Sequence, residues 1–271
     1  MILTVLADNR TISFSYFAKE GDAPESRATL RLSAIPPRSA DEYAALLDMM
    51  ASRRVSGTVQ CAIVASVVPT LTPVLQKALC ALYGNVPCLT VGAGLRTGLT
   101  LQTDSPGELG ADLVAMAVGA SMLQKPPFLV LNCGDITTLS AVAAGKDAPV
   151  YLGCAILPGT ALCASALKGE AALLSTVAPT TPTRAIGKNT TDSIRAGIVL
   201  GHAAAIDRLI TNFENELEAA DLPVIATGDE AELILPLLQH NTKKERELAH
   251  KGLWHLARIN ERKTKYPPKR G

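Results

Sequence analysis

Aromatic residues are scarce in this chain of 271 residues: they make up 4% of it, against 48% for all hydrophobic residues together. The core must therefore be filled mainly by aliphatic side chains, which suits helices packed on a parallel sheet. A chain of this length can bury one large core or two medium ones, because single domains usually run to ~100–200 residues.

A strong net charge is also missing, since 26 Lys and Arg oppose 25 Asp and Glu. The chain has no general field that would attract nucleic acid or an anionic membrane, so we expect neither as a partner. The exception is the basic C-terminal segment over residues 258–271, which we interpret as a solvated end. With the single tryptophan upstream, Trp254, this segment leaves nucleic-acid contact as a side hypothesis.

Close cysteine pairs and long apolar runs at the start of the chain are absent as well. The six cysteines include no CxxC pair, so they do not form a typical zinc or redox motif, and we expect reduced thiols in the core. The apolar opening, residues 1–6, has no basic leader and is soon interrupted by Asp8. It fits neither a secretion signal nor a membrane span, and we expect a cytoplasmic protein.

The pattern of strands and helices occurs twice along the chain. The first series has a strand meander over 1–17 and 28–35, a helix over 40–53 capped by Ser39, a strand within 58–68, a helix over 71–83 and a strand over 87–91. After a helix that ends near residue 123, the second has strands over 128–131, 137–143 and 149–157, helices over 159–174 and 190–219, a strand over 223–226 and helices over 230–240 and 242–260.

This repeated order predicts a duplicated α/β fold with an N-terminal lobe, 1–110, a C-terminal lobe, 111–271, and a central cleft. A single doubly wound sheet is the structural alternative.

Two polar turns follow strands at corresponding points of the two halves, at residues 8–11 and 132–138. Such turns can present backbone N–H groups and hydroxyls to phosphate, although an ordinary β-turn explains each of them as well. Asp112, in the first turn of a helix, is a candidate proton acceptor for a substrate hydroxyl. The helix dipole favours an aspartate there regardless of catalysis.

Taken in order, seven short segments resemble the type III pantothenate kinases: Ser66–Pro69, Gly92–Leu99, Gly110–Leu113, Gly134–Thr138, Gly153–Gly159, Gly187–Thr190 and Thr227–Gly228. The resemblance implies two actin-like, ribonuclease H-like lobes and a homodimer. It also implies transfer of the γ-phosphoryl group of ATP to the 4′-hydroxyl of pantothenate, the first step towards coenzyme A, with Mg²⁺ and a monovalent cation, K⁺ or NH₄⁺.

The resemblance also assigns roles to individual residues. Asp112 matches the proton acceptor, and Asn132 lies at the position linked to the monovalent cation. The nucleotide-site positions are Asp8, Asn9, Gly134, Asp135, Thr137 and Gly228, and the substrate-site positions are Thr97, Gly98, Thr103, Gly110, Ala111, Leu113 and Thr190.

Several of these positions depart from the family pattern. Leu6 stands where the family has an aspartate that anchors the metal on ATP, and leucine supplies no oxygen ligand. Asp8 replaces a glycine, so its carboxylate either takes over the metal or repels the triphosphate. The other replacements are Arg10 for threonine, Asn132 for aspartate, Asp135 for threonine, Leu113 for arginine, Thr103 for tyrosine and Asp229 for glycine.

At Leu113 the family has an arginine, and losing an arginine that pairs with a carboxylate costs on the order of 1.5–3 kcal/mol of binding free energy. Three functions therefore remain open: a pantothenate kinase, an inactive pseudokinase with a binding or regulatory role, and a kinase for another hydroxylated metabolite.

Overall fold

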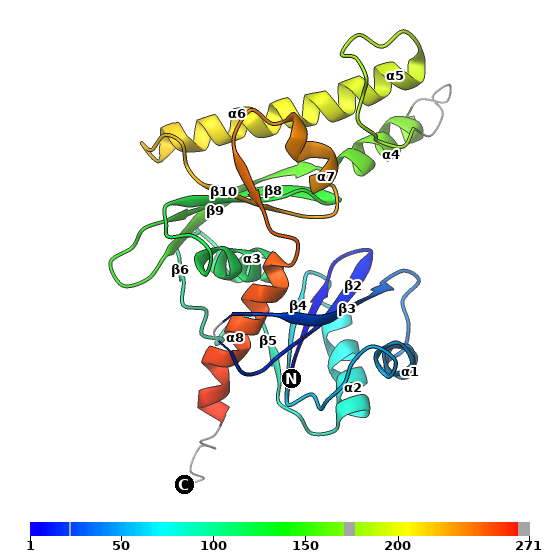
Figure 1. Cartoon of the computed structure of the whole chain (residues 1–271), viewed down its shortest axis with the longest axis vertical. Coiled ribbons are helices and arrows are strands. Elements are labelled where there is room, and N and C mark those ends of the chain that lie inside the picture. The colour runs from blue at the N-terminus through cyan, green and yellow to red at the C-terminus, as the bar shows by residue number, and fades with distance from the viewer. Residues whose placement is uncertain (22, 171–176, 265–271) are drawn as a thin grey trace. The chain divides into compact units, whose positions relative to one another are not determined.

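The computed structural model describes residues 1–21, 23–170 and 177–264. By contacts within the chain it forms two compact units (Figure 1). Unit 1 holds residues 1–99, 104–123 and those from 247 onwards, and unit 2 holds residues 100–103 and 124–246.

The sheet of unit 1 has the strand order β3-β2-β1-β4-β5. Its strands are β1 (Ile2–Ala7), β2 (Thr11–Phe17), β3 (Ser26–Ser33), β4 (Cys61–Ser66) and β5 (Cys88–Thr90). The first three form an antiparallel meander, and β4 and β5 run parallel to β1.

Side chains alternate across this sheet, as strand geometry requires. From β1, Leu3 and Val5 pack in one core with residues of α1 (Ala40–Ala51) and α2 (Leu71–Tyr83), whereas Thr4 bonds to His250 of α8 (Leu248–Thr264). Both faces of the sheet are therefore covered, which explains why β1 and β4 are almost continuously apolar.

Helix α3 (Ala111–Ser121) is buried along its whole length from Leu113 to Ala120 and packs against α8. The two helices meet at glycines, because a Cβ added to Gly119 would lie 2.2 Å from the Leu248 carbonyl oxygen. One added to Gly252 would lie 1.8 Å from the Ala115 carbonyl oxygen. The backbones thus approach more closely than any larger residue would allow.

Unit 2 repeats the sheet of unit 1. Its order is β11-β10-β7-β8-β9-β6, with an antiparallel meander β7-β8-β9 and parallel strands β10 and β11 beyond β7. The strands are β6 (Thr100–Leu101), β7 (Phe128–Asn132), β8 (Ile136–Ala143), β9 (Val150–Pro158), β10 (Val224–Thr227) and β11 (Thr242–Lys244).

One face of this sheet packs on α6 (Gly201–Glu216) and α7 (Ala231–Ile234) through Leu131, Ala226, Ile206 and Ile234. The remaining elements are η1 (Pro106–Glu108), α4 (Thr160–Glu170), α5 (Thr190–Arg195), the π-helical segment η2 (Ala196–Leu200) and η3 (Leu235–Leu237).

The strand order confirms the predicted duplication, because β3-β2-β1-β4-β5 and β9-β8-β7-β10-β11 are equivalent. The alternative of a single sheet is wrong. The compact units do not follow a single cut at residue 110, however. Helices α3 and α8 group with the first sheet because their apolar surfaces pack on each other and on β4.

Three predicted helices need correction. Residues 242–244 form β11, not helix, because they pair with β10, and α8 begins only at Leu248. The helix predicted over 230–240 shortens to α7 and η3. The helix predicted over 190–219 ends at Glu216 and contains the π-helical turn η2.

The expectation of buried thiols holds for some cysteines only. All six are free, and Cys61 and Cys133 are buried, but Cys80 is exposed. In the described ranges no helix combines the length and apolarity needed to cross a bilayer.

Trp254 is buried, and its indole N–H donates to the Ala18 carbonyl at 2.8 Å. Its ring is covered by the Arg258 guanidinium at 4.5 Å and is not available to stack on a base. Arg258 lies within α8, so the basic segment begins as ordered helix, while its residues 265–271 lie outside the described ones.

Candidate functional site

The first polar turn joins β1 to β2, and its own aspartate closes it. The Asp8 Oδ1 atom accepts the backbone N–H of Arg10 at 2.8 Å and that of Thr11 at 2.6 Å. The Asp8 N–H donates to the Thr11 carbonyl at 2.9 Å. Asp8, Asn9 and Arg10 are exposed, and β1 ends at Ala7, so Asp8 belongs to the turn. The N–H groups that a phosphate-binding turn would offer are thus bonded to a carboxylate.

Asp112 lies in the first turn of α3, half-buried. Burial raises the pKa of the Asp112 carboxyl above its ordinary value. The backbone N–H groups of Leu113 and Asp112 oppose this rise, and the nearby Asp8 carboxylate adds to it. Gly110 leaves room for this carboxyl, because a Cβ there would lie 2.5 Å from the Asp112 Oδ1 atom. A carboxyl with a raised pKa is suited to accept a proton.

The other predicted substrate positions of unit 1 differ in exposure. Ala111 is half-buried, whereas Leu113 is buried, as expected for a helix enclosed on all sides. Thr97 is half-buried beside exposed Gly98, in the loop between β5 and β6. The Thr97 hydroxyl donates to the Leu99 carbonyl at 3.1 Å and accepts the Leu99 N–H at 3.1 Å, while Gly98 has φ +77°.

The second polar turn joins β7 to β8 in unit 2, and glycines bring three backbone segments together around it. A Cβ on Gly159 would lie 2.0 Å from the Gly134 carbonyl oxygen. At Gly228, which has φ +105°, it would lie 2.1 Å from the Cys133 carbonyl oxygen. The turn thus touches both the start of α4 and the end of β10, and the predicted nucleotide positions Gly134, Asp135 and Gly228 lie together.

Glu230 joins these segments and has no counterpart among the predicted residues. Its carboxylate accepts the N–H of Thr160 at 2.9 Å and that of Ala161 at 3.0 Å, at the start of α4. Its own N–H donates to the Cys133 carbonyl at 2.8 Å. Within the described part of the chain, the buried Thr160 Oγ1 atom has no hydrogen-bond partner. A helix start attracts anions, and here a carboxylate of the chain occupies it.

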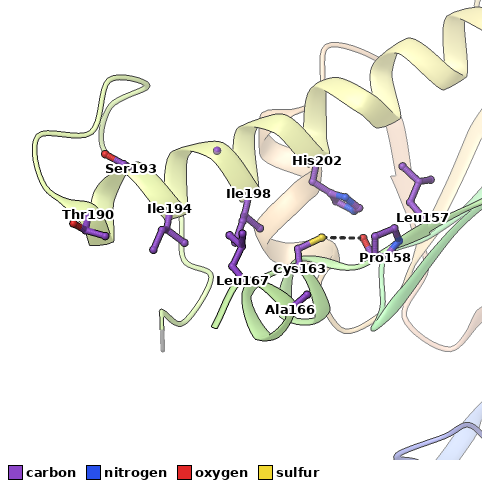
Figure 2. A pocket seen from close by; sticks show the side chains of 11 residues that line it. Leu157, Pro158, Cys163, Ala166, Leu167, Thr190, Ser193, Ile194, Ile198 and His202 are labelled. Carbon is purple, nitrogen blue, oxygen red and sulfur yellow. Dashed lines mark hydrogen bonds between the residues drawn. The ribbon is translucent and has the colours of Figure 1, made fainter. Parts of the chain in front are cut away.

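A pocket of about 840 Å³ adjoins the end of β9, and Figure 2 shows its lining. Its walls come from β9, α4 and the helical run from α5 to α6, and they are mostly apolar. The lining residues are Leu157, Pro158, Cys163, Ala166, Leu167, Thr190, Ser193, Ile194, Gly197, Ile198 and His202. Two of them come from the π-helical segment η2, a kind of turn frequent at functional sites.

One predicted residue lines the pocket, and another bonds to a residue of the lining. Thr190, predicted to contact pantothenate, is exposed on the lining. His202 also lines the pocket, and its Nε2 atom lies 3.0 Å from the hydroxyl of Thr137, which is predicted to contact the nucleotide. Burial lowers the pKa of His202 and so favours a neutral ring, while the Glu230 carboxylate partly offsets this effect. His202 was missed in the sequence because a histidine inside a helical pattern gives no local signal.

The predicted residues therefore fall into two groups. Unit 1 holds the first turn, the loop with Thr97 and Gly98, and the start of α3 with Asp112, whereas unit 2 holds Asn132, Gly134, Asp135, Thr137, Thr190 and Gly228. Thr103 belongs to unit 2, and its hydroxyl oxygen is buried without a hydrogen-bond partner among the described residues. Across those residues, no three or more His, Cys, Asp or Glu side chains form a metal-binding group.

Known proteins resemble this chain over most of its length. The family model for type III pantothenate kinase matches residues 2–212. The type III pantothenate kinase of Rhodococcus erythropolis is 32% identical over 256 residues, which cover 93% of each chain. That of Nocardia farcinica is 32% identical over 271 residues, covering 98% of this chain and 100% of the relative.

Two solved structures share the fold at low sequence identity. The activator of 2-hydroxyisocaproyl-CoA dehydratase from Clostridium difficile, solved with bound ADPNP, has a TM-score of 0.53 at 6% identity and covers 100% of this chain and 99% of its own. Component A of (R)-2-hydroxyglutaryl-CoA dehydratase from Acidaminococcus fermentans has a TM-score of 0.54 at 10% identity, covering 98% and 99%. This likeness confirms the predicted actin-like fold class.

Proposed function

Because the chain belongs to the type III pantothenate kinase family, we propose that it transfers the γ-phosphoryl group of ATP to the 4′-hydroxyl of pantothenate. Asp112 is the proposed proton acceptor. The observation that carries this role is the half-buried carboxyl at the start of α3, whose pKa is raised chiefly by burial. In phosphoryl transfer a protein mainly positions groups and neutralises charge, and a positioned carboxylate can orient the attacking hydroxyl.

Membership in a kinase family implies the use of ATP and a metal ion. We propose Mg²⁺ on the phosphates and a monovalent cation, K⁺ or NH₄⁺, near Asn132. Magnesium sites on nucleotides take one or two carboxylates plus phosphate oxygens. Asp8 fits this requirement only in part, because its Oδ1 atom already accepts two N–H groups of the turn. Asn132, at the end of β7, offers an amide oxygen without charge.

The nucleotide positions proposed in unit 2 are Gly134, Asp135, Thr137 and Gly228. They are supported by the close backbone contacts of the turn with Gly159 and Gly228. Asp8 and Asn9 are the nucleotide positions proposed in unit 1. The proposed pantothenate contacts are Thr97, Gly98, Thr103, Gly110, Ala111, Leu113 and Thr190. A cytoplasmic homodimer completes the proposal by family resemblance.

A pseudokinase that binds or regulates is the second candidate, and one feature of the first turn favours it. In that turn the N–H groups of Arg10 and Thr11 are bonded to the Asp8 carboxylate. A phosphate would have to displace this carboxylate or approach it against charge repulsion. Leu6 adds no oxygen ligand to compensate.

An assay coupled to ADP release separates the candidate functions. It is run with pantothenate and with a panel of hydroxylated metabolites on the wild type and on Asp112→Asn. Turnover with pantothenate that disappears in the variant supports the proposal. Turnover only with another metabolite indicates a kinase of different specificity, and no turnover with any substrate indicates the pseudokinase.

A matched control for the variant is Asp41→Asn. Asp41 occupies the same place in the first turn of α1 as Asp112 does in α3, but it is exposed. We expect the control to keep full turnover. Calorimetry with Mg–ATP adds an independent test, since affinity at millimolar or tighter concentration contradicts the argument that the first turn disables nucleotide binding.

A further inference from the structure

The amide of Asn260 holds the backbone of a single residue in the glycine-rich loop, residues 92–98. Asn260 is only 6% exposed, near the C-terminal end of α8. Its Oδ1 atom accepts the Arg96 N–H at 3.1 Å, and its Nδ2 atom donates to the Arg96 carbonyl at 2.8 Å. Nδ2 also donates to the Leu256 carbonyl within α8 at 2.9 Å. The side chain thus satisfies both backbone groups of Arg96, as a neighbouring strand would.

The other hydrogen bonds of this loop are local. The Leu95 N–H donates to the Gly92 carbonyl at 3.2 Å, and among the described residues the Thr97 hydroxyl bonds only to Leu99. Within the described part of the chain, Asn260 is therefore the side chain that ties the loop backbone to another element. The loop contains Gly94 and Gly98, both with positive φ, and glycine loses the most conformational freedom when it is ordered.

The same helix also holds α3. At Gly252 the backbone of α8 lies directly against Ala115 and Gly119 of α3. Asn260 follows Gly252 by eight residues, which is about 12 Å along a helix. One helix, α8, thus contacts both the helix whose first turn holds Asp112 and the loop that carries Thr97 and Gly98. The match to the family model ends at residue 212, so α8 lies outside it.

We propose that Asn260 is a positioning residue, which fixes the loop 92–98 in the conformation that contacts the substrate. This inference rests on the proposed function, since the substrate role of the loop comes from that proposal. Losing the clamp costs two hydrogen bonds to Arg96 and leaves the loop to be ordered at the expense of substrate binding.

The test is the variant Asn260→Leu, because leucine is nearly the same size as asparagine but has neither a hydrogen-bond donor nor an acceptor. Steady-state kinetics are measured separately for pantothenate and for ATP. We expect the KM for pantothenate to rise about tenfold or more, from the loss of hydrogen bonds of ordinary strength. We expect kcat to stay within about twofold and the KM for ATP to stay unchanged, because most of the proposed nucleotide positions lie in unit 2.

Arg258→Ala is the matched control on the same helix. It removes the hydrogen bond from the guanidinium to the Gly21 carbonyl and the contact with Trp254, but nothing that touches the loop. We expect a comparable loss of stability without a change in the KM for pantothenate. An equal rise of both KM values in Asn260→Leu, or the same rise in the control, overturns the positioning role.

Hydrogen exchange of the loop amides provides a readout that does not need activity. We expect the Arg96 amide to exchange faster in Asn260→Leu, and less so in Asn260→Asp, which keeps the acceptor but loses both donor bonds. Unchanged exchange in Asn260→Leu overturns the proposal outright. If the wild type neither binds nor phosphorylates pantothenate, the proposed function and the substrate role of the loop fail. Faster exchange then still supports the hold of Asn260 on Arg96.

Discussion

The contact between α3 and α8 depends on the absence of a side chain at Gly252, and Gly252→Ala tests this directly. The added methyl carbon would lie 1.8 Å from the Ala115 carbonyl oxygen and 2.9 Å from the Gly119 nitrogen. Ordinary van der Waals contact for such a carbon begins at 3.4 Å. The helices therefore have to separate by roughly 1.5 Å at this point, and no flexible side chain can absorb the shift because both obstacles are backbone atoms.

Two opposing effects set the size of the change in stability. Replacing a glycine by alanine inside a helix stabilises it by about 1 kcal/mol. Overpacking a tight contact costs about 1–3 kcal/mol and more when backbone has to move. Because a distance of 1.8 Å between the added carbon and the carbonyl oxygen is a severe overlap, we expect a net loss of about 2 kcal/mol or more in the free energy of unfolding of unit 1. For a protein of this size that corresponds to a Tm lower by roughly 5 °C or more.

Trp254 makes the assay specific for unit 1, because it is the single tryptophan of the chain and lies buried on α8. Thermal unfolding is followed by its fluorescence in Gly252→Ala and in Gly201→Ala. Gly201 lies in α6 of unit 2, and a Cβ there would meet nothing within 4 Å, so this control should leave the transition seen by Trp254 at or above the wild-type temperature. If Gly252→Ala melts at or above the wild-type temperature, the close contact of the two helices is refuted.

Three further predictions concern charges. The half-buried carboxyl of Asp112 has a raised pKa, so its contribution to stability is lost as the pH rises through that pKa. Asp112→Asn should therefore melt at a higher temperature than the wild type at pH 8, unlike Asp41→Asn. Burial lowers the pKa of His250 to about 3. The stabilisation from the neutral ring is therefore full above the pKa of about 6.5 in the unfolded chain, and the free energy of unfolding falls by about 1 kcal/mol per pH unit below that value. The difference in Tm between pH 7 and pH 5 should accordingly be smaller in His250→Asn than in the wild type. Glu230→Ala removes the hydrogen-bond acceptor at the start of α4 and should lower the free energy of unfolding by about 1–2 kcal/mol. Glu230→Gln, which keeps an acceptor oxygen, should lower it by less, and thermal unfolding followed by circular dichroism measures both.

Elements with strong local signals could be predicted from the sequence. Helix α1 has a capping box: the Ser39 hydroxyl accepts the Glu42 N–H, and the Glu42 carboxylate accepts the Ser39 N–H. The bounds predicted for α2, residues 71–83, match the structure because the apolar spacing and the glycine that follows act within the helix itself. The repeated order of strands predicted the duplication for the same reason.

Features that depend on distant partners could not be predicted. Strand β11 has three residues, Thr242–Lys244, that adopt an extended form only because β10 lies beside them. The contact of Asn260 with Arg96 joins residues 164 positions apart. Asp8 follows Leu6 by two residues, a spacing that places both side chains on one face of a continuous strand. The strand β1 ends at Ala7, however, and the Asp8 side chain turns back onto the N–H groups of Arg10 and Thr11.

The segments that identify the family are mostly built on glycine, and this explains why membership of the family does not by itself establish the reaction. Gly159 and Gly228 are needed where backbones approach closely, and Gly110 where the Asp112 carboxyl lies against the chain. Such positions constrain the shape of the backbone whether or not phosphate is transferred. The positions that depart from the family pattern, among them Leu6, Asp8 and Asp135, are ones at which the resemblance places charges and ligand atoms, which constrain chemistry and leave the fold intact. The glycines that shape the backbone therefore identify the family in a sequence comparison, whereas the residues that supply charges and ligand atoms decide the reaction.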